Sequence, residues 1–114
     1  MKTADASTQL CPRFHTAVEL IGKRWSGAVI RLLLGGAVRF HDLKRAIPEI
    51  SDKMLSERLK ELEAAGIVVR QVIPETPVRV EYSLTPKGQA LEVPLNTLSE
   101  WAETWLAEPE VQAT

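Results

Sequence analysis

Several features that identify common classes of protein are missing from this sequence. It has one cysteine, so no disulfide can form within the chain, and Cys and His do not supply four zinc ligands. No apolar run approaches the roughly 18 residues that a membrane-spanning helix needs. The N-terminal stretch MKTADASTQL lacks the apolar region of a signal peptide. We therefore expect a cytoplasmic protein without a structural metal site.

The groups that most enzymes need are also missing. The sequence has no phosphate-binding loop, no paired carboxylates in an apolar setting, and no nucleophile with an accompanying base. His15 and His41 fall in different predicted helices, without carboxylates at the spacing of a metal site. The sequence therefore predicts a protein that is not an enzyme, with no catalytic residue, no metal and no cofactor.

Positive charge is missing from the last part of the chain and concentrated in the middle. Residues 89–114 contain five glutamates and no Lys or Arg, whereas residues 23–60 contain nine Lys or Arg and four acids, a net charge of +5. The whole chain carries only −1, but an anionic partner responds to the face that it meets. The middle segment is expected to attract an anion such as nucleic acid, unless its charges only form solvated helix faces.

No repeat, low-complexity tract or linker divides the 114 residues. Hydrophobic residues make up 45% of the chain, which is enough for a buried core. We expect one domain over residues 11–107, between short flexible tails at 1–10 and 108–114.

Apolar spacing and helix-ending residues predict four helices in the first two thirds of the chain. They are expected over residues 12–21, 25–34, 38–47 and 52–65, and are ended by Gly22, Gly35–Gly36, Pro48 and Gly66. Pro12 suits a first helical position, and Ser51 is a capping residue. The side chains expected to face the core are Phe14, Val18, Ile21, Val29, Leu32, Leu33, Phe40, Leu43, Ile47, Leu55, Leu59 and Leu62.

After Gly66 the apolar period changes from that of a helix to that of a strand. "IVVRQVI" (67–73) and "VRVEYSL" (78–84), separated by "PETP", predict a β-hairpin. Its buried face is expected to carry Val78, Val80, Tyr82 and Leu84. Thr85 and Pro86 then open a last helix, which Pro94 must bend or interrupt. This order of elements is that of a winged helix-turn-helix, a mainly α fold with a small β-hairpin (α+β).

The fourth predicted helix has a second face that a core does not explain. In a helix-turn-helix this helix enters the major groove of DNA, its first residues reach base edges, and nearby cations reach phosphates. The residues expected to bind DNA here are Ser51, Lys53, Met54, Ser56 and Glu57, with Arg39, Lys44, Arg45, Arg58 and Lys60 assigned to phosphates. The alternative is a solvated face of ion pairs one turn apart.

Chemistry suggests a role for individual residues of this surface. Lys53 can donate to guanine, Ser56 to most base edges, and Met54 can contact a thymine methyl group. Glu57 can accept from cytosine or only pair with a lysine along the helix. Arg79, near the tip of the hairpin, suits a minor groove or its phosphates, unless it only bonds locally.

Four stretches of the chain resemble one known family. "CP" at residues 11–12, "ELIGKRW", "RFHDLKRAIPEISDKMLSERLKELEAAGIVVR" and "PETPVRVEYSLTPKG" follow the order found in the HxlR-type winged-helix regulators of bacteria. The resemblance spans roughly Cys11 to Trp101. It implies a dimeric regulator that binds double-stranded DNA in the bacterial nucleoid, often in answer to oxidants, aldehydes or electrophiles. It maps the recognition helix onto residues 51–65 and the wing onto 68–84, while Glu57 replaces a common glutamine.

The last predicted helix carries more apolar surface than one small domain needs. The residues expected to form a dimer interface are Leu91, Leu95, Leu98, Trp101 and Trp105. A homodimer would match an inverted-repeat operator. The alternative is that this helix packs back on its own domain, against Val18 and Ile21.

Cys11 is a candidate sensor of a small oxidant or electrophile. It precedes Pro12 at a helix start, beside Arg13 and four residues before His15, and helix N-termini and positive charge favour the reactive thiolate. The resemblance adds that some relatives sense oxidants through a cysteine at this place. The alternative is a packing residue without chemistry.

The function expected from these observations is a sequence-specific, homodimeric DNA-binding regulator of transcription. The alternative is a winged helix that binds another protein instead of DNA. That alternative would leave the face around Lys53 and Lys60 without nucleic acid.

Overall fold

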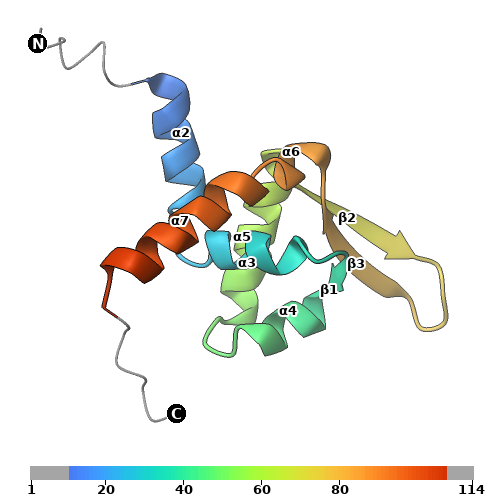
Figure 1. Ribbon diagram of the computed structural model, residues 1–114. Coiled ribbons are helices and arrows are strands. Elements are labelled where there is room, and N and C mark those ends of the chain that lie inside the picture. Colours follow the sequence, from blue (N-terminus) through green and yellow to red (C-terminus); the bar gives the residue numbers. More distant parts are fainter. Residues whose placement is uncertain (1–10, 108–114) are drawn as a thin grey trace, which may run out of the picture.

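The computed structural model describes residues 11–107, so both predicted tails lie outside the described residues. The elements are α2 (Pro12–Ile21), α3 (Ser26–Leu33), β1 (Val38–Arg39), α4 (Phe40–Ala46), α5 (Asp52–Ala64), β2 (Val68–Ile73), β3 (Arg79–Leu84), α6 (Pro86–Gln89) and α7 (Glu92–Trp105). Figure 1 shows the β2–β3 hairpin projecting from one side of the helices, with α2 and α7 at the other side. The predicted winged helix-turn-helix is confirmed, with α4 and α5 as its two helices.

The core lies between α3, α4, α5 and the base of the hairpin. Its buried hydrophobic residues are Val29, Ile30, Leu33, Leu43, Ile47, Ile50, Leu55, Leu59, Leu62, Ile67, Val68, Tyr82, Leu84 and Leu95. In α3 the buried positions follow the spacing of one helix face, from Ser26 through Ile30 to Leu33. Leu32 lies off that face and is 37% exposed, so its predicted burial was wrong.

Helix α2 has the predicted bounds but not the predicted packing. None of its ten residues is buried, and Phe14 and Val18 are 65% and 49% exposed. Only Leu20 and Ile21, in the last turn, pack partly against the core. Phe14 and Val18 were expected in the core because they are apolar and recur at helical spacing. Such spacing does not show whether another element covers that face of the helix.

A third strand was missed by the sequence analysis. Val38 and Arg39 form β1 rather than the start of a helix, and they pair with Tyr82 and Glu81 of β3. The sheet is antiparallel in the order β1-β3-β2, so β3 is central. Strand β1 has only two residues, which are too few to show the alternation of a strand in the sequence. Val78 was also predicted wrongly, because it lies before β3 in the hairpin turn and is 62% exposed.

The predicted caps hold α5 in place. Ser51 Oγ accepts a hydrogen bond from the Met54 amide at 3.0 Å, as an N-cap does. Beyond the other end, Gly66 has a φ of +77°, which favours glycine. The loop into β2 is further tied by Lys87 Nζ, which donates to the carbonyl oxygen of Ala65 at 2.6 Å.

The last predicted helix is two helices, and the break precedes Pro94. Thr85 Oγ1 caps α6 by accepting from the Gly88 amide at 3.1 Å. Pro94 is the third residue of α7, in the first turn, where backbone amides have no acceptor within the helix. A proline is therefore tolerated there, and the helix is interrupted at Ala90 and Leu91 instead. Within residues 11–107, no helix has the length and apolar character needed to cross a membrane.

Candidate nucleic-acid and subunit interfaces

Helix α5 is anchored by one face and open on the other. Leu55, Leu59 and Leu62 are at most 1% exposed and face the core. On the opposite side Lys53, Glu57 and Lys60 are exposed, and Ser56 is half-buried on the flank. The helix therefore presents a polar, two-lysine face to solvent.

Two residues at the start of α5 are partly used by the fold. Ser51 accepts the capping hydrogen bond with its hydroxyl oxygen, which leaves the hydroxyl hydrogen available to donate. Met54 packs partly against the core, so only part of its side chain is offered to a partner.

The preceding elements add cations near this face. Arg39 is exposed at the N-cap of α4, and Lys44 is half-buried. Arg45 lies 3.8 Å from Asp42, with side chains that are 72% and 53% exposed. An exposed pair at this distance is weak, so Arg45 can exchange it for a phosphate.

Arg58 is placed differently from the sequence-based expectation. Its side chain is only 13% exposed. Its Nε donates to the backbone oxygen of Arg24 at 2.8 Å, and its Nη1 lies 3.1 Å from Glu61 Oε1. We therefore leave Arg58 out of the candidate surface.

The arginine of the hairpin also bonds locally. Arg79 Nη2 lies 3.2 Å from Glu75 Oε2, and its Nε lies 3.0 Å from Glu81 Oε2. With 29% of the side chain exposed, its charge is largely balanced within the wing. Arg79 and Arg39 both line a hollow between the wing and the start of α4.

The sequence analysis did not single out a second cation of the wing, Arg70. Arg70 is exposed in β2 and has no ion pair among residues 11–107. It is the only cation in "IVVRQVI", and that interruption of an apolar strand was the signal that could have identified it.

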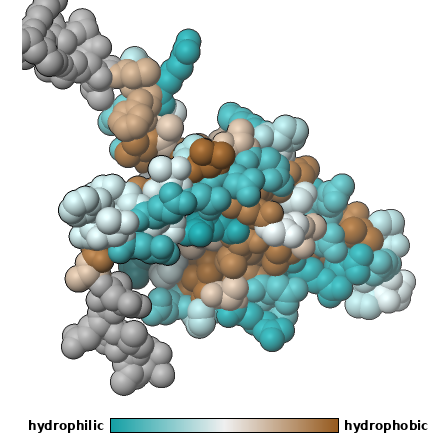
Figure 2. Space-filling view, in the orientation of Figure 1, coloured by the Kyte–Doolittle hydropathy of each residue, from teal (hydrophilic) through white to brown (hydrophobic). Residues whose placement is uncertain are grey.

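An apolar surface remains on α2 and α7. Of the five predicted interface residues, Leu98, Trp101 and Trp105 are 58%, 52% and 72% exposed. Leu95 is 6% exposed and belongs to the core of its own domain, and Leu91 is half-buried against it. Figure 2 shows further hydrophobic surface along α2, where Phe14 and Val18 lie. We therefore leave Leu95 out of the candidate subunit interface.

Cys11 lies at the start of this apolar surface. Its side chain is exposed, and its residue is the N-cap of α2. Its carbonyl oxygen accepts from the His15 amide at 2.9 Å, so the helix begins immediately, as expected. A hollow of about 580 Å³ begins at the next residues, Pro12 and Arg13, and reaches Leu91.

Comparison with known proteins places this geometry among helix-turn-helix regulators. Residues 20–110 match the sequence profile of a family described as HxlR-like helix-turn-helix. The uncharacterized HTH-type transcriptional regulator YvaP of Bacillus subtilis is 52% identical over 99 residues, which are 87% of this chain and 92% of YvaP. The HTH-type transcriptional regulator YodB of the same organism is 51% identical over 94 residues, which are 82% of this chain and 84% of YodB.

Solved structures agree with the sequence comparison. The reduced form of YodB from B. subtilis matches with a TM-score of 0.79 and 49% identity, covering 90% of this chain and 99% of that chain. The oxidized form of the redox regulator HypR matches with a TM-score of 0.78 and 38% identity, covering 89% of this chain and 100% of that chain. YodB structures also exist in diamide-treated and quinone-bound forms.

Proposed function

This chain belongs to the HxlR-like helix-turn-helix family of transcriptional regulators and is not an enzyme, and from this premise we propose that it binds operator DNA as a redox-responsive homodimer. The specific proposal is that α5 reads bases in the major groove of double-stranded DNA. The wing and α4 would bind the adjacent backbone, and Cys11 would receive the signal.

The exposed face of α5 is the observation that carries the DNA-binding proposal. Its leucines fix the helix against the core, so that Lys53 and Glu57 are exposed near the N-terminal end of the helix, with Ser56 half-buried beside them. Residues at this end of a recognition helix reach base edges. Lysine and serine can donate to guanine or adenine acceptors, and glutamate can accept from cytosine.

Backbone contacts are proposed for the exposed cations around this helix. Lys60 follows on α5, and Arg39, Lys44 and Arg45 lie on the elements before it. Arg70 takes the place of Arg79 as the wing cation, because Arg79 is balanced by two glutamates. Such contacts position a protein on the duplex without reading its sequence.

Selection from random duplexes tests the DNA-binding proposal directly. We expect enrichment of an inverted repeat whose half-sites are about one helical turn apart, roughly 10 base pairs, or a multiple of that. Affinity should fall linearly with the logarithm of salt concentration, because phosphate contacts release counterions. A library that stays random, with no salt-dependent retention, would favour a winged helix that binds protein instead.

The homodimer proposal is supported by the apolar surface of α2 and α7. Leu98, Trp101 and Trp105 would remain in water if the chain were a monomer, and Phe14 and Val18 would add to that surface. Large exposed apolar patches mark interaction sites, and aromatic residues are enriched in them. A second copy of the chain also explains how two recognition helices meet a symmetric operator.

The redox proposal is supported by the exposure of Cys11 and by the treated forms of YodB. A cysteine thiol that has lost its proton can add to a quinone ring as the thiolate. Its electron pair forms the carbon–sulfur bond, the quinone is reduced to a hydroquinone, and the ring takes up one proton to replace the one that the thiol released. Diamide instead oxidises two thiols to a disulfide and is itself reduced to the hydrazine. With one cysteine in the chain, that disulfide must join two subunits or one subunit and a small thiol.

Comparison of wild type with Cys11→Ser tests the redox proposal. Both proteins should bind the selected operator equally before treatment. After treatment with diamide or a quinone, operator affinity should change in wild type and remain constant in Cys11→Ser. Equal responses of the two proteins, or none in either, would leave Cys11 without a sensing role.

A further inference from the structure

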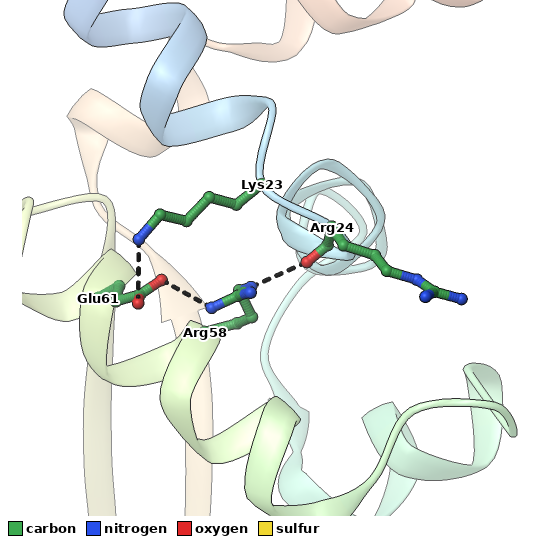
Figure 3. Close-up of polar contacts among 4 residues, drawn as sticks. All are labelled: Lys23, Arg24, Arg58 and Glu61. Carbon is green, nitrogen blue, oxygen red and sulfur yellow. Dashed lines mark hydrogen bonds and ion pairs between the residues drawn. The ribbon is translucent and has the colours of Figure 1, made fainter.

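A polar network of four residues links α5 to the connection between α2 and α3, residues 22–25 (Figure 3). Arg58 Nε donates to the backbone oxygen of Arg24 at 2.8 Å. The two oxygens of Glu61 have different partners, because Oε1 lies 3.1 Å from Arg58 Nη1 and Oε2 lies 3.1 Å from Lys23 Nζ. One carboxylate therefore joins a cation of α5 to a cation of the connection.

The geometry of Arg58 is suited to fixing the orientation of α5 relative to the connection. The Lys23–Glu61 pair is 48% and 36% exposed, and exposed pairs add little stability. Arg58 is 13% exposed, and its planar guanidinium holds a carbonyl oxygen and a carboxylate together. Rotation or sliding of α5 against the connection would break one of these two bonds.

The connection itself has little freedom to absorb such movement. Trp25 has a φ of +78°, in the left-handed region that side-chain-bearing residues rarely adopt. The Arg24 guanidinium lies over the Trp25 ring, 4.8 Å from its centroid. A Cβ added at Gly22 would lie 2.6 Å from the carbonyl oxygen of Val18. A change in the direction of α2 would therefore reach Arg24 and its partner.

Helix α2 is the element most able to change direction. It has no buried residue, and it packs against the core only through Leu20 and Ile21 at its end. Figure 1 shows its first turns standing away from the other helices. A force at its start, where Cys11 lies, would turn the helix about its last turn, beside the network.

We propose that Arg58 and Glu61 are positioning residues that couple the direction of α2 to the angle of α5 in the DNA groove. They act without touching DNA, and the network carries a change at Cys11 to the recognition helix. The consequence for DNA rests on the proposed function, whereas the coupling between the two helices belongs to the protein alone.

Glu61→Gln distinguishes positioning from plain electrostatics, because the two predict opposite signs. Loss of a negative charge beside DNA would tighten binding to every sequence. Loss of positioning should weaken operator binding roughly three- to tenfold while leaving the affinity for unrelated duplexes and the salt slope unchanged. Operator binding at or above wild-type affinity would overturn the proposal.

Arg58→Lys separates positioning from a phosphate contact. Lysine keeps the charge, and so would keep a phosphate contact, but it lacks the two-sided geometry of guanidinium. We expect the same loss of operator affinity as in Glu61→Gln. The matched control is Glu63→Gln, which removes a carboxylate from the same helix outside the network and should bind the operator like wild type. Wild-type operator affinity in Arg58→Lys would overturn the proposal.

A second measurement needs no DNA, so it separates failure of this inference from failure of the proposed function. Gly22→Ala displaces the connection, and hydrogen exchange of the α5 amides reports the effect there. In the wild-type background, Gly22→Ala should raise the exchange rate of the α5 amides on the order of threefold. In a Glu61→Gln background, where the network is already broken, Gly22→Ala should cause no further rise. Independent effects of the two substitutions would overturn the coupling. Coupled exchange in a chain that binds no operator would overturn only the DNA-binding proposal.

Discussion

At the scale of single residues, the cations of this chain divide by what their side chains contact. Lys53 and Lys60 are exposed on the outer face of α5, whereas Arg58 and Lys23 are both paired with Glu61. A positive charge is therefore available to a partner at some positions of α5 and is paired within the protein at others. Lys53 and Lys60 are both exposed but lie about two turns apart, so only Lys53 is near the N-terminal end of α5, where base contacts are expected.

Lys53→Ala and Lys60→Ala should weaken DNA binding in different ways. Lys53→Ala is expected to cost about 1–3 kcal/mol of operator binding and to relax base preference at one position, as for a base contact. Lys60→Ala should weaken binding to all sequences and reduce the salt slope by about 1, as for a phosphate contact. Fluorescence anisotropy on operator and substituted duplexes at several salt concentrations measures both. Identical behaviour of the two variants would contradict the assignment.

Glu61 should make the free energy of unfolding depend on pH in the acidic range. Its pKa is lowered from the ordinary value of 4.5, first because Lys23 donates a hydrogen bond to it, with further lowering from the charge of Lys23 and from Arg58. A carboxylate whose pKa is lower in the folded protein stabilises the fold above the unfolded value, and that stabilisation is lost as the pH falls through the folded value. The difference in unfolding free energy between wild type and Glu61→Gln should therefore shrink below pH 4.5. Urea unfolding at pH 7 and in acid checks this, and a constant difference would count against it.

At the scale of elements, α6 connects the wing to the recognition helix. Thr85 Oγ1 donates to the carbonyl oxygen of Gly66, directly after α5, and Lys87 donates to that of Ala65. Gly88 is buried and lies so close to the Ile67 carbonyl oxygen that a Cβ would overlap it. The base of the wing is thus held by backbone contacts that leave no room for a side chain.

Gly88→Ala should destabilise the protein because backbone atoms cannot move aside easily. We expect a loss of about 1–3 kcal/mol in the free energy of unfolding, as for overpacking of a close contact. Gly35→Ala is the matched control, because a Cβ there meets nothing within 4 Å. Denaturant unfolding of both variants measures the difference. A Gly88→Ala protein as stable as the control would show that α6 shifts freely.

At the scale of the whole molecule, the exposed apolar surface of α2 and α7 is the basis of the proposed homodimer. Trp101 and Trp105 are exposed in the second half of α7, and Figure 1 shows the end of α7 on the other side of the helices from the wing. A second copy covering the apolar side would leave both recognition helices exposed. We therefore expect substitutions on α7 to change assembly without changing the exposed residues of α5.

Leu98→Asp should disrupt the proposed dimer without altering the core. Leu98 is 58% exposed in the isolated chain, so a monomer would accept aspartate there, whereas a desolvated interface would not. Trp101→Ala should act in the same direction, because buried aromatic anchors dominate interfaces. Sedimentation at micromolar concentration measures the assembly, with Val78→Asp on the exposed hairpin as control. A wild-type protein that sediments as a monomer would contradict the dimer.

By itself, the sequence determined the features that depend on neighbours along the chain. The leucines of α5 recur at helical spacing, Ser51 caps the helix three residues before Met54, and Gly66 ends it. These signals predicted the elements and, through their order, the confirmed winged helix-turn-helix. Two-residue β1 was missed because its pairing with β3 joins residues more than 40 positions apart.

Only the tertiary structure decided which of these residues are available to a partner. Arg58 has the charge and the position on α5 that are expected of a DNA contact. Its side chain instead donates to the backbone oxygen of Arg24, which lies 34 residues away in the sequence. Leu95 has the spacing of the apolar stripe on α7, yet it belongs to the core, whereas Leu98 one turn later is exposed. Burial and pairing arise between segments that are distant in sequence, and residue spacing within one helix contains no information about them.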